Sequence, residues 1–133
     1  MSTSKYTLEF KNHFSDCQSI IQKLDSLMQS LCEDNMKAPA AANAFESLST
    51  AYEEKFDHFF SAFEQLHIEM PGKAVLYPIE QELLSCWEMV DHLRFVAGKI
   101  NKLTEDQISN IVLGLLELYR LKFETLEELI SAL

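Results

Sequence analysis

Apolar residues recur at the three-four spacing of an α-helix in four consecutive stretches of the chain, and two of these stretches keep the spacing throughout. In the first, the apolar series is Phe10, Phe14, Cys17, Ile21, Leu24, Met28 and Leu31. In the third, it is Ile79, Leu83, Cys86, Val90, Leu93, Ala97 and Ile100. The pattern predicts an all-α protein in which each helix buries one face. Because short links join long helices, we expect a single up-down-up-down four-helix bundle.

Turn-forming residues separate these stretches. Asp34-Asn35 marks a break after the first helix, and Pro39 suits the first turn of the second, where its missing N–H would lack a partner anyway. Met70-Pro71-Gly72 is the strongest turn signal, and it lies in the longest predicted link, residues 68–77.

The fourth helix has the clearest start in the sequence. Thr104 with Gln107 makes a capping box, and Leu103 with Ile108 makes the hydrophobic staple around it. We therefore expect one domain over residues 1–133, with helices at about 7–33, 39–67, 78–98 and 105–132.

Composition and charge narrow the class of protein. Of 133 residues, 47% are hydrophobic and only three are Gly and three Pro, a balance typical of packed helices. The net charge of −10 argues against nucleic acid as a ligand, because phosphate binding needs clustered Lys and Arg. No window approaches the roughly 20 apolar residues of a membrane span. Three cysteines is an odd number that does not suggest a disulfide framework, so we expect a cytoplasmic protein.

The second helix carries two features beside each other. One is an aromatic arc, which we interpret as core, although a cavity between helices remains an alternative. It comprises Phe45, Tyr52, Phe56, Phe59, Phe60 and Phe63. The other is an acidic ridge of Glu46, Glu53, Asp57 and Glu64, whose spacings of seven, four and seven return to one side of a helix. A ridge of this kind either keeps the surface solvated or docks a basic partner.

Three further residues stand out from the helical pattern. Leu84 and Phe95 point away from the main apolar face of the third helix, and either form a small contact site or lie under the 68–77 link. We favour the covering, because that link contains apolar residues that must lie on something. Lys122 falls inside the apolar stripe of the fourth helix, so we expect its ammonium group to reach water or to meet a carboxylate.

Metal-site patterns are incomplete. A ferritin-like dinuclear site needs Glu-x-x-His on two helices, and this chain has the single match Glu64-x-x-His67. Asn12-His13 and Tyr77-Pro78-Ile79 are similar to a hemerythrin-like bundle, a resemblance that implies inward His and carboxylate ligands on several helices. The positions that align with those ligands carry Lys55, Phe59, Cys86 and Lys122. We therefore expect no metal and no cofactor.

No Gly-rich phosphate loop, nucleophile motif or pair of inward carboxylates is present, so we expect no enzymatic activity. The sequence favours a non-catalytic interaction module of the adaptor, chaperone, immunity or inhibitor type. Its partner would be a basic or neutral protein, contacted through Glu46, Glu53, Asp57, Glu64, Leu84 and Phe95. A ligand- or metal-binding bundle with its site in the aromatic core is the alternative, and self-assembly into a homodimer is a third hypothesis.

Overall fold

The computed structural model describes the backbone of residues 5–33 and 38–133, and the side chains of residues 5–30 and 39–133. Within these ranges the chain is an all-α four-helix bundle, as predicted. The elements are α1 (Lys5–Glu33), α2 (Ala38–Glu69), α3 (Leu76–Lys99), the short 3-10 helix η1 (Ile100–Lys102) and α4 (Glu105–Ser131). The predicted break at Asp34-Asn35 and the side chains of Leu31 and Cys32 lie outside the described residues.

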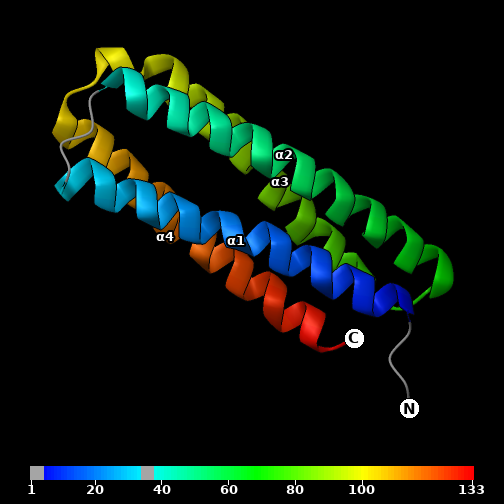
Figure 1. Ribbon diagram of the computed structural model, residues 1–133. Coiled ribbons are helices and arrows are strands. Elements are labelled where there is room, and N and C mark those ends of the chain that lie inside the picture. The colour runs from blue at the N-terminus through cyan, green and yellow to red at the C-terminus, as the bar shows by residue number, and fades with distance from the viewer. Residues whose placement is uncertain (1–4, 34–37) are drawn as a thin grey trace.

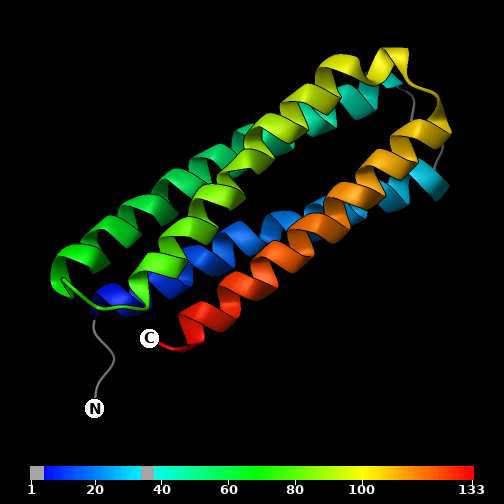
Figure 2. The ribbon, with the colours of Figure 1, turned by 180° about the vertical axis from the view of Figure 1, so that it is seen from behind.

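Successive helices run antiparallel (Figure 1), and each packs on the next along the chain while α4 also packs on α1. The view from behind shows α3 and α4 in front of α1 and α2 (Figure 2). The α2–α3 link lies at the end of the bundle where α1 begins and α4 finishes. The observed order is therefore the predicted up-down-up-down arrangement, and the described α2–α3 link makes no crossover.

The apolar stripes meet along the axis of the bundle in one continuous core. Five of the six aromatic residues in the α2 arc are buried, and Phe60 is half-buried. Phe59 lies at the centre of a ring cluster, with centroids 4.9 Å from Phe10, 5.9 Å from Phe14 and 5.9 Å from Phe56. The interpretation of the arc as core is confirmed for these buried rings, because they fill the interior against one another.

The N-terminal ends of α2 and α4 lie where the local sequence signals predict them. Pro39 lies in the first turn of α2. At the start of α4, the Gln107 N–H donates to the Thr104 hydroxyl at 3.2 Å, and the Thr104 N–H donates to the Gln107 side chain at 3.0 Å. The predicted capping box is present, and it satisfies two N–H groups that a helix start leaves without partners.

The α2–α3 link is shorter than predicted. α2 continues to Glu69 and α3 begins at Leu76, which leaves residues 70–75 instead of 68–77. Gly72 adopts a positive φ of 78°, a conformation that a residue with a Cβ rarely adopts, and this lets the chain reverse over a few residues.

This short link corrects the expected covering of Leu84 and Phe95. Their exposed fractions are 49% and 67%, so the link does not cover them. The reason is that Ile68, which was expected to fold over α3 as part of a loop, is a helical residue of α2 and is itself 71% exposed. The outer face of α3 therefore displays both apolar side chains.

Within the described residues, none of the helices combines the length and apolar character that crossing a membrane requires.

Candidate functional site

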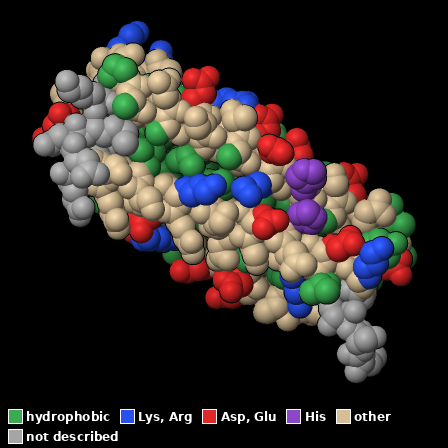
Figure 3. All heavy atoms as spheres, in the orientation of Figure 1, with side chains coloured by type: hydrophobic (Ala, Val, Ile, Leu, Met, Phe, Trp, Pro, Cys, Tyr) green, Lys and Arg blue, Asp and Glu red, His purple; other side chains and the backbone are tan. Residues whose placement is uncertain are grey.

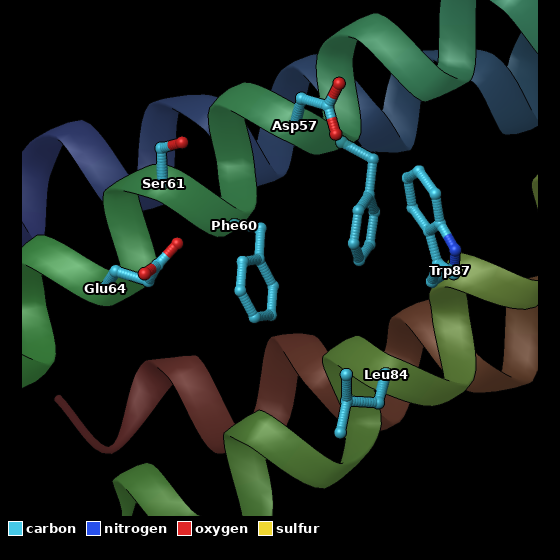
Figure 4. Close-up of a pocket in the computed structure, with 7 residues that line it drawn as sticks. Asp57, Phe60, Ser61, Glu64, Leu84 and Trp87 are labelled. Carbon is cyan, nitrogen blue, oxygen red and sulfur yellow. The ribbon is translucent and has the colours of Figure 1, made fainter.

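A hollow of about 380 Å³ opens between α2 and α3, and we call it the α2/α3 groove. Figure 4 shows the Phe60 and Trp87 rings extending into the space between the two helices, with Asp57, Ser61 and Glu64 along α2 at its margin. Its lining residues are Phe56, Asp57, Phe60, Ser61, Glu64, Leu84 and Trp87. The groove therefore joins an aromatic floor to an acidic edge.

Ring contacts form the floor of the groove. The centroid of Phe56 lies 5.1 Å from that of Trp87 and 6.5 Å from that of Phe60. Phe56 is buried, whereas Phe60 and Trp87 are half-buried and keep part of their rings accessible. The floor thus continues the core outward to the surface, and it offers flat apolar surface to a bound group.

Helical spacing places the α2 residues of the groove on one face. Asp57, Ser61 and Glu64 follow one another at intervals of four and three, which brings them into a row along the helix. Leu84 and Trp87 are three residues apart and supply the opposite wall from α3. Nearby, α2 is joined to α3 by two buried hydroxyls: Ser49 donates to the Val90 carbonyl at 3.0 Å, and Tyr52 donates to the Cys86 carbonyl at 2.7 Å.

The two carboxylates of the groove are available to an external cation. Asp57 and Glu64 are exposed, and neither forms an ion pair with a Lys or Arg among the residues that the structure describes. Glu53 differs from them, because its carboxylate pairs with Arg94 of α3. An incoming positive charge would therefore meet Asp57 and Glu64 without first displacing an internal partner.

The structure separates the six residues that the sequence proposed as a contact site. Asp57, Glu64 and Leu84 line the groove together. Glu46 instead lines a separate hollow along α2, with Asn43, Ser47, Thr50, Ala51 and Glu54. Phe95 lies outside the groove lining, with the Lys99 ammonium 6.0 Å from its ring centroid. The acidic ridge is thus divided: Glu53 pairs with Arg94, Asp57 and Glu64 line the groove, and Glu46 lies outside it.

Sequence reasoning missed Trp87 and assigned Phe60 to the core. Trp87 lies next to the α3 apolar stripe position Cys86, and Phe60 lies beside Phe59. A ring adjacent to a core position on each of two neighbouring helices is the signal that marks such a groove. This signal locates a groove only when it is known which sides of α2 and α3 face each other. Apolar periodicity alone does not say which sides these are.

Lys122 meets no carboxylate among the described residues and contacts α3 instead. Its half-buried ammonium group donates hydrogen bonds to Ser85 of α3, at 3.4 Å from the carbonyl oxygen and also to the hydroxyl. It lies 5.6 Å from the Tyr119 ring centroid, and the Tyr119 hydroxyl is 2.7 Å from Nδ1 of His92. Lys122 thus has hydrogen-bond partners at the α3/α4 seam and keeps part of its surface exposed to solvent.

The buried thiols and phenols are poorly suited to chemistry. Burial raises the pKa of both Cys17 and Cys86 to about 12, from a reference value of 9.0. Burial also raises the pKa of Tyr52 and of Tyr119 well above the usual value. Because the thiolate is the nucleophilic and metal-binding form, Cys17 and Cys86 are inert at neutral pH. Both are free thiols.

Two histidines meet on the opposite side of α2. Figure 3 shows two histidine side chains next to each other on the face that α1 and α2 form. His13 and His58 stack with centroids 5.9 Å apart, and Nδ1 of His13 is 3.9 Å from an Asp16 carboxylate oxygen. Even so, the described residues hold no group of three or more His, Cys, Asp or Glu side chains placed to bind a metal ion.

Comparisons with protein families, with curated proteins and with solved structures find no match for this chain.

Proposed function

We propose that this protein is a non-catalytic interaction module that docks a basic protein partner in the α2/α3 groove. The observation that carries the proposal is the pairing of accessible rings, Phe60 and Trp87, with two carboxylates, Asp57 and Glu64, that have no internal cation among the described residues. Apolar surface beside unpaired charge fits a partner that presents both an apolar side chain and a positive one.

Net charge supports a basic partner. A charge of −10 raises the rate at which a positively charged protein meets this one, and local carboxylates then favour orientations that bring the cation to the groove. The buried part of the contact would come from Phe60, Leu84 and Trp87, since desolvated aromatic and aliphatic groups supply most of the affinity at interfaces.

Capture from a lysate of the source organism tests the proposal with two matched variants. Asp57→Lys/Glu64→Lys reverses the charge of the groove, whereas Glu46→Lys/Glu54→Lys makes the same charge change elsewhere on α2. Tagged wild-type protein and both variants are incubated with lysate at low and at moderate salt, and retained proteins are identified by mass. Circular dichroism first establishes that all three proteins are equally helical.

We expect one stoichiometric basic partner, weakened by salt, lost by the groove variant and retained by the matched control. Retention of that partner by both variants would place docking elsewhere on the surface. The absence of any stoichiometric partner at either salt concentration would overturn the proposal.

A further inference from the structure

The α2/α3 groove extends beyond the residues described above. A second hollow of about 300 Å³ adjoins it and is lined by Phe60, Phe63, Glu64, His67, Ile68 and Glu80. Because Phe60 and Glu64 line both hollows, the two hollows adjoin each other along the same pair of helices. We call the two hollows together the extended groove.

The extended groove follows the length of α2 over several turns. From Phe56 to Ile68 it follows thirteen residues of α2, and the twelve steps between them rise about 18 Å at about 1.5 Å per residue. A groove of that length matches about three turns of a bound helix. It is longer than a single side chain or a small cation needs.

Acidic groups border the extended groove on both of its sides. Asp57 and Glu64 come from α2, and Glu80 comes from α3. Glu80, like the other two, forms no ion pair with a Lys or Arg in the part of the chain that the structure describes. The same lining contains apolar groups that remain accessible, including Leu84 at 49% and Ile68 at 71% exposure.

We infer that the occupant of the extended groove is a basic amphipathic helix of about three turns, supplied by the partner. This inference rests on the proposed function and names the chemistry of the partner. Apolar side chains at positions i, i+4 and i+7 of the helix would enter between Phe60 and Leu84, and Lys or Arg on its flanks would face Asp57, Glu64 and Glu80.

Backbone chemistry favours a helix over an extended peptide. Both walls of the extended groove are α-helices, whose internal N–H and C=O groups already bond within their own helix. An extended segment would therefore gain no ladder of main-chain hydrogen bonds here, whereas a helix satisfies its own backbone. A second copy of this chain is disfavoured, because each copy carries a charge of −10.

The chain contains a built-in reporter for this inference. Trp87 is its single tryptophan, and it lies half-buried in the groove lining. Intrinsic fluorescence of the full chain therefore responds to occupation of the groove, without a label, provided that the added peptide contains no tryptophan or tyrosine.

The probe is a synthetic peptide of about sixteen residues, with leucines at i, i+4 and i+7 and lysines on both flanks of that stripe. A diastereomer carries D-residues at several central positions, so it has the same composition and charge but cannot form the helix. A third peptide replaces every lysine with glutamate. Each is titrated into wild-type protein and into the Asp57→Lys/Glu64→Lys and Glu46→Lys/Glu54→Lys variants while Trp87 emission is recorded.

We expect saturable binding of the helical lysine peptide, at least tenfold weaker for the diastereomer and for the glutamate peptide. The groove variant should weaken binding of the helical peptide at least tenfold, and the matched control should leave it within about twofold.

Three results would overturn the inference in distinguishable ways. Equal, groove-dependent affinity for the helical peptide and its diastereomer would remove the helix while leaving basic docking in the groove intact. No saturable change with either lysine peptide would remove both. A change in Trp87 emission on concentrating the protein alone would assign the groove to a second copy.

Discussion

Two phenylalanines at opposite extremes of exposure give the sharpest test of the bundle described above. Phe59 has an exposed fraction of 0% and contacts the rings of Phe10, Phe14 and Phe56. Phe95 lies on the outer face of α3 with 67% of its surface exposed. Substitution of each by alanine removes the same atoms, so any difference in the free energy of unfolding reports the surroundings of the ring.

The expected magnitudes follow from burial. Phe59→Ala should lower the free energy of unfolding by about 3–5 kcal/mol, because transfer free energy is lost and a cavity remains between three rings. Phe95→Ala should change it by no more than about 0.5 kcal/mol, since nothing encloses that ring. A domain of this size is stabilised by about 5–15 kcal/mol, so the first loss is a large share of the total.

Urea unfolding monitored by circular dichroism measures both values on proteins of equal concentration. Phe59→Leu serves as a control that keeps most of the side-chain volume, and it should lose much less stability than Phe59→Ala. Equal losses for Phe59→Ala and Phe95→Ala would refute the placement of α2 and α3 about the core. A large loss for Phe95→Ala that appears only at high protein concentration would point to burial of that ring between two copies.

Two other predictions follow from buried polar groups. Tyr52→Phe removes a buried hydrogen bond to the Cys86 carbonyl with little change in shape, so it should lower the free energy of unfolding by about 1 kcal/mol; an unchanged urea midpoint would contradict that bond. Burial raises the pKa of Cys17 and Cys86 to about 12, so the unfolded chain releases these protons first and stability should fall as pH rises from 9 toward 12. Urea titrations at about pH 8 and about pH 10.5 measure how much the free energy of unfolding falls between these pH values. That fall should be smaller for Cys17→Ala/Cys86→Ala than for wild type, and equal falls in both proteins would argue against burial of the thiols as the cause.

Much of the fold follows from sequence because its determinants are local. The periodicity around Phe10 and Phe14 depends on neighbours three and four residues away, and the capping box of Thr104 with Gln107 depends on one turn of chain. The predicted helix ends on either side of Met70 were less accurate. The turn signal located the reversal itself, but it gave no measure of how far α2 continues before it.

The candidate site was predictable only in part, because it depends on contacts between helices. Asp57 and Glu64 stand out by spacing on one helix, and Leu84 stands out as an apolar residue off the seam. That Arg94, 41 residues from Glu53, neutralises one member of the ridge is a fact of tertiary packing. Trp87 likewise joins the site through the rotation of α3 against α2, which no local pattern encodes.

The two hydroxyl bonds between α2 and α3 bear on how α3 is rotated about its own axis. Every residue of α3 has a carbonyl group, but only the carbonyls on the flank that faces α2 can reach Ser49 and Tyr52. Rotation of α3 would carry the carbonyls of Val90 and Cys86 away from Ser49 and Tyr52 together, leaving two buried hydroxyls without acceptors at about 1–3 kcal/mol each. Ser49 and Tyr52 therefore favour one rotation of α3 against α2. With that rotation fixed, both walls of the groove stand in place before a partner arrives, and association does not have to order them.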